Sequence, residues 1–180
     1  MHTQVAIIGA GPAGSLLSHL LHEQGIDSVV LERRSQEYVL GRIRAGVLEH
    51  GSARVLRDAG LGERMDRDGD EHDGVALAFG GGRTRIDFRS LVDRSVTVWG
   101  QTEVQHDLYD AMHGWGARLL DEVDEVELHD VTGERPRVTF TRDGQREELT
   151  CDWIAGCDGA HGVSRGAMPD GLRRTYERAY

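Results

Sequence analysis

The first 32 residues alternate between two branched apolar runs and one amphipathic segment, with glycines at the junctions. The apolar runs at residues 3–8 and 28–32 have the length and composition of buried strands. Four leucines recur at helical spacing between them: Leu16, Leu17, Leu20 and Leu21. Gly25 then provides a stop for the predicted helix. This order predicts a β-α-β unit, whose usual size is about 30 residues.

The remaining chain carries helical and strand periods in a mixed order, which is typical of the α/β class. The predicted elements are helices at 47–61 and 102–115, a short helix within 33–40, an acidic turn-rich stretch at 66–74, a hairpin of 75–79 and 84–88, and strands at 96–99, 123–129, 137–142 and 148–154. No internal repeat or low-complexity segment interrupts them. We therefore expect one compact domain over residues 1–180.

Charge and composition limit the classes of binding partner and of chemistry that we expect for the chain. The formal net charge is −10, which disfavours binding to nucleic acid or to an anionic membrane. All 21 basic residues are arginine, so neither a Schiff-base lysine nor a Walker-type lysine exists. The two cysteines, Cys151 and Cys157, match no disulfide framework or CxxC pattern, and we expect reduced thiols in a cytoplasmic protein.

Two clusters of potential metal ligands do not have the residue spacing of a known metal-binding motif. The acidic run at 66–73 lacks the glycine and the glutamate that a calcium-binding EF-hand loop requires. His19 and His22 lie three residues apart, without the glutamate of a zinc-protease helix. We therefore predict no metal site.

A glycine-rich turn joins the first predicted strand to the first predicted helix. Gly9 permits the tight turn, Gly11 keeps side-chain atoms away from a pyrophosphate, and Gly14 lets helix and strand pack closely. Glu32 ends the second strand, where an acidic side chain accepts hydrogen bonds from a ribose hydroxyl. The pattern predicts a dinucleotide site. FAD and NAD fit it equally, whereas the 2′-phosphate of NADP would be repelled by the carboxylate.

Two longer segments carry a resemblance to a known family. Residues 38–47 read Tyr-Val-Leu-Gly-Arg-Ile-Arg-Ala-Gly-Val, and residues 156–165 read Gly-Cys-Asp-Gly-Ala-His-Gly-Val-Ser-Arg. Both resemble segments of the flavoprotein aromatic hydroxylases, as do residues 98–104 and 133–136. The resemblance runs over essentially the whole chain. It implies a Rossmann-like FAD-binding domain with an additional antiparallel sheet, in which residues 75–99 contribute strands to the substrate-side sheet.

The resemblance also implies which residues hold the cofactor. The expected FAD-binding residues are Gly9, Gly11, Gly14, Glu32, Arg42, Ile43, Arg44, Ala45, Gly46, Val47, Gln101, Asp158 and Gly159. From the residues alone, Arg42 and Arg44 would be two solvent-facing arginines, and Asp158 with Gly159 an ordinary turn.

A second group of residues is expected to bind the reductant, NADPH or NADH. Its members are Arg33, Arg34, Ser35, Tyr38, His161 and Arg165. Two adjacent arginines favour NADPH, because a guanidinium pairs well with a 2′-phosphate. His72 matches a position that ends a proton relay in this family, and an exposed loop histidine is an equal alternative. No substrate-binding residue is predicted.

The implied activity is ortho-hydroxylation of a phenolic acid, with 4-hydroxybenzoate converted to 3,4-dihydroxybenzoate as the favoured reaction in aromatic catabolism. It requires FAD, a nicotinamide reductant and O₂, and a homodimer is expected at full length. Members of the family are considerably longer, so we expect these 180 residues alone to be inactive. Two alternatives stay open: another FAD-dependent phenol hydroxylase or oxidoreductase of the same fold, and a non-catalytic dinucleotide-binding fragment.

Overall fold

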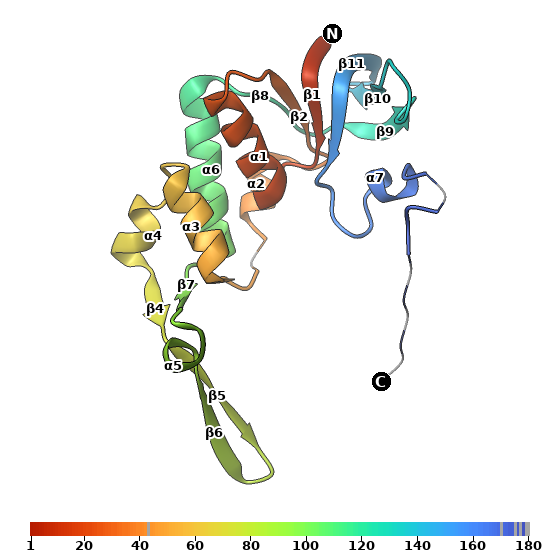
Figure 1. Cartoon of the computed structure of the whole chain (residues 1–180). Helices are drawn as coiled ribbons and strands as arrows, with labels where there is room; N and C mark the ends of the chain where they lie inside the picture. Colours follow the sequence, from red (N-terminus) through yellow and green to blue (C-terminus); the bar gives the residue numbers. More distant parts are fainter. Residues whose placement is uncertain (43, 170, 175, 177, 179–180) are drawn as a thin grey trace. The chain divides into compact units, whose positions relative to one another are not determined.

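The computed structural model describes residues 1–42, 44–169, 171–174, 176 and 178. The chain divides into two compact units (Figure 1). The first comprises Met1–Val39 and Met112–Tyr180, and the second comprises Leu40–Ala111. No helix of the described residues combines the length and the apolar character needed to cross a membrane.

A six-stranded sheet forms the centre of the first unit. Its strands, in spatial order, are β8 (Arg118–Leu120), β2 (Ser28–Leu31), β1 (His2–Ile8), β11 (Gln145–Gly156), β10 (Arg137–Arg142) and β9 (Asp124–His129). The strands β8, β2, β1 and β11 run parallel, while β10 pairs antiparallel with both β11 and β9. This confirms the predicted Rossmann-like class with its β-α-β start. The antiparallel strands extend the same sheet.

Helix α1 (Pro12–Glu23) packs against β1 and β2 of this sheet. All four residues of β2 are buried, which explains its uninterrupted apolar sequence, because strands of a parallel sheet are covered on both faces. The core joins side chains from both parts of the sheet: Ala6, Ile8, Val29, Leu31, Val123, Val138, Phe140, Leu149 and Cys151. The glycine-rich turn between β1 and α1 therefore rests on a closely packed base.

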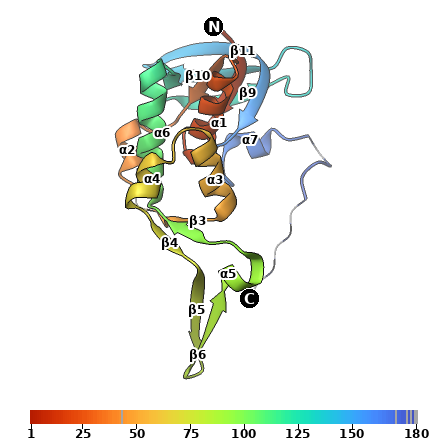
Figure 2. The same cartoon turned by 60° about the vertical axis from the view of Figure 1, so that its left-hand side comes forward.

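The second unit contains a small antiparallel sheet and a separate hairpin (Figure 2). Its elements are β3 (Val47–Leu48), β7 (Val96–Val98) and β4 (Asp70–His72) in the sheet, β5 (Gly74–Phe79) and β6 (Gly82–Asp87) in the hairpin, and helices α3 (His50–Asp58), α4 (Glu63–Asp68) and α5 (Phe88–Val92). Helix α6 (Gln101–Trp115) begins here and ends in the first unit. Gly80 and Gly81 turn the hairpin with positive φ angles of 56° and 76°, as a two-residue turn requires.

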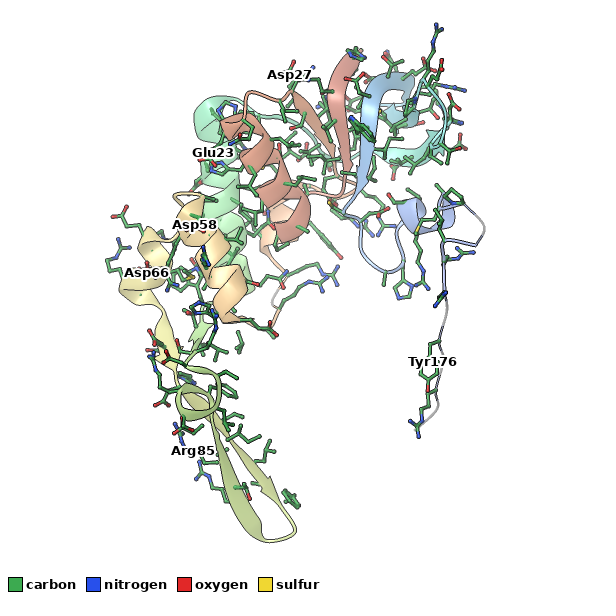
Figure 3. The ribbon with its side chains drawn as sticks, in the orientation of Figure 1. Glu23, Asp27, Asp58, Asp66, Arg85 and Tyr176 are labelled. Carbon is green, nitrogen blue, oxygen red and sulfur yellow. The ribbon has the colours of Figure 1, made fainter. Side chains whose placement is uncertain are left out.

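The hairpin exposes apolar side chains on one face. Val75, Leu77 and Phe79 alternate along β5 and are 41%, 45% and 73% exposed. Arg85 lies on β6 (Figure 3). Its side chain forms an ion pair with Asp73, which precedes β5. An isolated two-stranded hairpin is marginally stable in water, so its apolar face is well suited to packing against further strands.

Two sequence predictions for the second unit are wrong. Residues 47–49 precede helix α3 because Val47 and Leu48 pair with β7. The stretch 66–74 is not a turn, since it contains the end of α4 and all of β4. Asp66 lies on α4 (Figure 3), where it forms an ion pair of 2.7 Å with the Arg57 side chain of α3. Strand β7 supplies the backbone partners of β4.

Besides β3 and β4, four short elements were absent from the prediction: α4, α5, β8 and α7 (Val163–Gly166). Each has six residues or fewer, too few to show a hydrophobic period. The short helix expected within 33–40 is confirmed as α2 (Gln36–Leu40).

Leu149 tests the core of the first unit. Its side chain is fully buried, whereas Leu172 is 70% exposed. We expect Leu149→Ala to lower the free energy of unfolding by about 2–5 kcal/mol, because it leaves a cavity. The matched variant Leu172→Ala should change it by less than about 0.5 kcal/mol. Urea titrations followed by circular dichroism measure both, and equal effects would contradict the described core.

Candidate functional site

The glycine-rich turn at the end of β1 is packed more tightly at two of its glycines than at the third. A Cβ atom on Gly14 would lie 1.9 Å from the carbonyl oxygen of Gly9. One on Gly9, whose φ is +100°, would lie 2.6 Å from the carbonyl oxygen of Cys157. A Cβ atom on Gly11 would meet nothing within 4 Å. Gly9 and Gly14 thus serve packing, and Gly11 borders open space.

That open space lies at the N-terminus of α1. Gly11 is the N-cap residue of this 12-residue helix and provides no side-chain cap, while Pro12 occupies the first turn. The first-turn N–H groups of a helix have no intrahelical acceptor, and the helix dipole makes this end positive. The arrangement is suited to binding a phosphate group.

Glu32 is fixed beside the turn by hydrogen bonds to both carboxylate oxygens. The Ala10 N–H donates to Oε2 at 2.8 Å, and the Arg34 N–H donates to Oε1 at 2.9 Å. Its backbone is held between Leu120 and Val123, because the Glu32 N–H donates to the Leu120 carbonyl and the Glu32 carbonyl accepts from Val123. Each carboxylate oxygen keeps a further acceptor position, so Glu32 can bind a ribose hydroxyl without rearrangement.

A second loop closes on the glycine-rich turn from the end of β11. The contact of Gly9 with Cys157 places Asp158 and Gly159 directly beside the turn. The Asp158 carboxylate accepts a hydrogen bond of 3.0 Å from the Ser164 N–H, at the start of α7. A Cβ atom on Gly162 would lie 2.0 Å from the Asp158 Cγ, so this glycine lets the loop close. Gly162 and Ser164 were absent from the predicted site.

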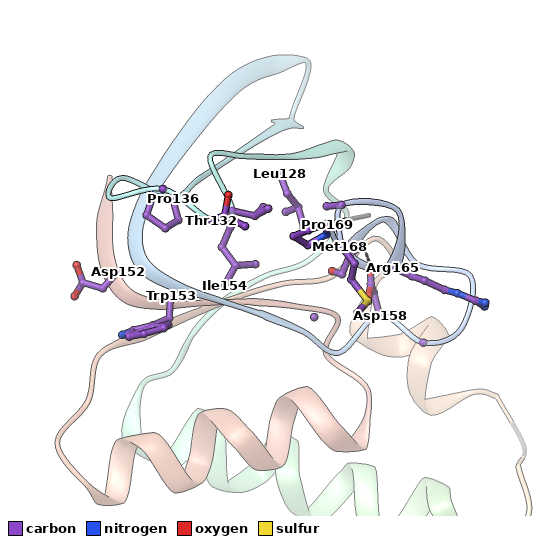
Figure 4. Close-up of a pocket in the computed structure, with 16 residues that line it drawn as sticks. Leu128, Thr132, Pro136, Asp152, Trp153, Ile154, Asp158, Arg165, Met168 and Pro169 are labelled. Atoms are coloured by element: carbon purple, nitrogen blue, oxygen red, sulfur yellow. Dashed lines mark hydrogen bonds between the residues drawn. The ribbon is translucent and has the colours of Figure 1, made fainter. Parts of the chain in front are cut away.

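A hollow of about 800 Å³ is lined by residues of this loop together with residues of β9 and β11 (Figure 4). Its lining is mainly apolar, with Leu128, Pro136, Ile154 and Met168 contributing, and Asp158 lies at one end. The predicted residue Arg165 also lines it, and its guanidinium donates to the Ala160 carbonyl at 3.1 Å. His161 is exposed on the same loop.

The residues expected to bind the reductant adenosine directly follow Glu32. Arg33 and Arg34 are both exposed, and the Arg34 guanidinium lies 5.1 Å from the centre of the Tyr38 ring. The Ser35 hydroxyl accepts a hydrogen bond of 3.2 Å from the Tyr38 N–H. These four residues therefore form one local surface that combines two positive charges with an aromatic ring.

In the second unit, two groups of predicted FAD-binding residues lie close together. The Trp99 N–H donates to the Gly46 carbonyl at 2.9 Å, and a Cβ atom on Gly46 would lie 2.4 Å from the Gly100 Cα. Gly46 therefore has to be glycine. Gln101 follows as the first residue of α6, so residues 44–47 and Gln101 are neighbours within this unit.

Other predicted residues of the second unit are less constrained. Arg42, Arg44 and Ala45 are exposed, and Ile43 lies outside the described residues. His72 is exposed on β4, where it pairs in register with Val96 of β7.

The β1–turn–α1–β2 arrangement, with its open helix N-terminus and the fixed carboxylate of Glu32, defines a dinucleotide-binding domain. The sequence model of one family, described as FAD binding domain, matches residues 2–179. The chain belongs to this family.

Two curated relatives are aromatic hydroxylases. The p-hydroxybenzoate hydroxylase of Acinetobacter baylyi is 43% identical over 181 aligned positions, which cover all of this chain and 45% of that protein. A 3-(3-hydroxy-phenyl)propionate/3-hydroxycinnamic acid hydroxylase of Burkholderia cenocepacia is 29% identical and covers 91% of this chain and 31% of that protein. The chain thus spans less than half the length of each of these two relatives.

Solved structures share the fold. The crystal structure of pqsL, a probable FAD-dependent monooxygenase from Pseudomonas aeruginosa, superposes with a TM-score of 0.78 at 22% identity, covering 100% of this chain and 48% of that chain. The p-nitrophenol 4-monooxygenase PnpA from Pseudomonas putida gives a TM-score of 0.77 at 22% identity, covering 92% and 43% of the two chains. Both likenesses support the Rossmann-like architecture of the chain.

Glu32→Ala tests whether the carboxylate holds the turn before any nucleotide binds. We expect the free energy of unfolding to fall by about 1–3 kcal/mol, because the Ala10 and Arg34 N–H groups lose their acceptor. Glu37, an exposed residue of α2, provides the matched control Glu37→Ala, which should have little effect. Urea unfolding measures both variants. Equal stabilities would show that the turn does not depend on Glu32.

The reactivity of Cys157 tests the packing of the β11 loop against the glycine-rich turn. Burial raises the pKa of its thiol, and the negative charge of Asp158 raises it further. Only the thiolate is nucleophilic, so alkylation by iodoacetamide should be slow at neutral pH and should rise with a midpoint above about 8.5, the value of a free cysteine. Cys151→Ala removes the other thiol as background. A midpoint at or below that of free cysteine would contradict the described environment.

Proposed function

We propose that the chain binds FAD and forms the nucleotide-binding part of an NAD(P)H-dependent aromatic hydroxylase. The observation that carries the proposal is the open space beside Gly11, bounded by the uncapped N-terminus of α1 and the oriented carboxylate of Glu32. A pyrophosphate fits the first feature and a ribose the second. Membership of the FAD-binding-domain family favours FAD over NAD as the dinucleotide.

Different groups of residues are proposed to contact different parts of the cofactor. Glu32 would accept hydrogen bonds from the adenosine ribose, and the first turn of α1 would bind the pyrophosphate. Asp158 and Gly159 would flank the cofactor where their loop meets Gly9. Residues 42–47 and Gln101 of the second unit are proposed to contact the flavin ring. When bound, FAD would supply the electron-transfer and oxygen-activating chemistry, for which this chain has no substitute.

The proposed reaction of the whole protein is the ortho-hydroxylation of a phenolic acid. The relative with 43% identity is a p-hydroxybenzoate hydroxylase, which favours 4-hydroxybenzoate as substrate. The exposed apolar face of β5 supports a role for residues 75–99 in a substrate-side sheet. His72 is proposed to exchange the phenol proton with solvent, because an imidazole can both accept and donate a proton and this side chain is exposed.

The surface of Arg33, Arg34, Ser35 and Tyr38 is proposed to bind the adenosine end of the reductant, together with His161 and Arg165. Two exposed guanidinium groups would attract a 2′-phosphate, which favours NADPH over NADH. Stacking of an adenine on Tyr38 is compatible with either reductant.

Gly11→Val tests the cofactor site without disturbing the fold. Gly11 has an extended backbone with φ −70° and ψ −178°, and its Cβ position is open, so valine fits the chain itself. We expect the purified chain to bind FAD saturably and the variant to lose binding, because the side chain occupies the pyrophosphate path. Gly51→Val is the matched control, since the Cβ position of Gly51 is likewise open and this exposed glycine lies outside the proposed site. Quenching of flavin fluorescence measures affinity, with NADH and NADPH as competitors.

Three outcomes would contradict the proposal. Equal FAD affinities for Gly11→Val and the wild-type chain would place the pyrophosphate elsewhere. Displacement of FAD by NADH at similar concentrations would show that the turn serves a nicotinamide dinucleotide. Absence of FAD binding by a folded wild-type chain would remove the FAD assignment for these 180 residues.

A further inference from the structure

Arg64 of α4 contacts three side chains that frame the start of α6. Its guanidinium forms an ion pair of 2.5 Å with Glu103 and a second, shorter one with Asp107. The same group lies over the Trp99 ring, 5.4 Å from the ring centre. Glu103 and Asp107 are one turn apart on α6, so a single cation joins α4, the first two turns of α6 and the residue that follows β7.

The Trp99 ring lies against this cation and has no side-chain hydrogen bond of its own among the described residues. The side chain is only 8% exposed. Packing and the cation–π contact therefore hold the ring. The backbone of Trp99 in turn fixes Gly46, because its N–H donates to the Gly46 carbonyl at 2.9 Å. A displaced Trp99 would shift residues 44–47 on one side and Gln101 on the other.

We propose that Arg64 is a positioning residue for flavin binding, which it serves by holding Trp99 and the start of α6 so that residues 44–47 and Gln101 form one surface. The inference rests on the proposed function, in which this surface contacts the flavin ring. Arg64 itself touches none of the residues expected to bind FAD in the described contacts.

An arginine suits this position better than a lysine. The planar guanidinium can stack on an indole while its two Nη atoms donate to different carboxylates, and here Nη1 donates to Asp107 and Nη2 to Glu103. Hydrogen bonds to Asp107 and then Glu103 raise the pKa of Arg64 above its ordinary value, so Arg64 is a cation at neutral pH. A lysine could keep the charge but not this three-way geometry.

Arg57 provides a matched control within the same unit. It belongs to α3 and forms a comparable ion pair of 2.7 Å with Asp66 of α4, and both pairs are part-exposed. The described contacts of Arg57 include neither Trp99 nor α6. A loss that reflects only a missing ion pair on α4 would appear in both variants, whereas a loss specific to the flavin side would appear for Arg64 alone.

The test compares two probes, FAD and ADP, on the wild-type chain and on Arg64→Met, Arg64→Lys and Arg57→Met. ADP carries the adenosine and pyrophosphate but lacks the flavin. We expect Arg64→Met to weaken FAD binding by about tenfold, or 1.4 kcal/mol, with ADP affinity unchanged. The FAD affinity of Arg64→Lys should lie between those of Arg64→Met and the wild-type chain. Arg57→Met should match wild type for both probes.

The wild-type titration is read first, because failure to bind FAD there contradicts the proposed function itself. Once wild-type binding is established, three results overturn the role of Arg64. These are unchanged FAD affinity in Arg64→Met, equal losses of FAD and ADP affinity, and an equal FAD loss in Arg57→Met. If circular dichroism shows that Arg64→Met does not fold, Arg64→Lys decides, and wild-type FAD affinity in that variant overturns the proposal.

Discussion

The hydrogen bond from the Ala10 N–H to the Glu32 carboxylate connects the two halves of the proposed nucleotide site, the glycine-rich turn and the end of β2. It can form only because Gly9 and Gly14 let the turn approach its neighbours closely: Gly9 lies against Cys157, and Gly14 lies against Gly9. The position of α1, the orientation of the acid and the contact with the Asp158 loop all follow from this close packing. A chain with net charge −10 thereby has a local arrangement suited to a dianionic pyrophosphate, because backbone N–H groups and a helix dipole do not depend on net charge.

Sequence patterns predicted the first unit well because its elements are strongly periodic and its glycines have separate steric roles. The strand at 137–142 coincides with β10, and the turn between β1 and α1 lies where the glycines indicated. The same reasoning could not predict that Asp158 bonds to Ser164, or that Gly162 is needed for this closure, because both depend on how a short loop folds back.

The second unit was predicted less well, for a related reason. Its sheet pairs strands of only two or three residues, so the stability of each comes from partners distant in sequence rather than from local pattern. Acidic residues near 66–70 indicated a turn, yet Asp66 serves as the partner of Arg57, and Asp70 pairs with β7. The proposed influence of Arg64 has the same origin, because this residue of α4 contacts Trp99, Glu103 and Asp107, which are distant in sequence and lie near residues 44–47 and Gln101.

Hydrogen–deuterium exchange of the chain with and without saturating FAD tests the central claim most directly. The account predicts slower exchange at the first-turn amides of α1 and around Glu32 and Asp158, because these groups lie against the pyrophosphate and ribose. The amides of β9 and of the β5–β6 hairpin, which take no part in that site, should exchange as before. Saturable FAD binding without protection of residues 10–15 would contradict the assignment of the glycine-rich turn as the nucleotide site.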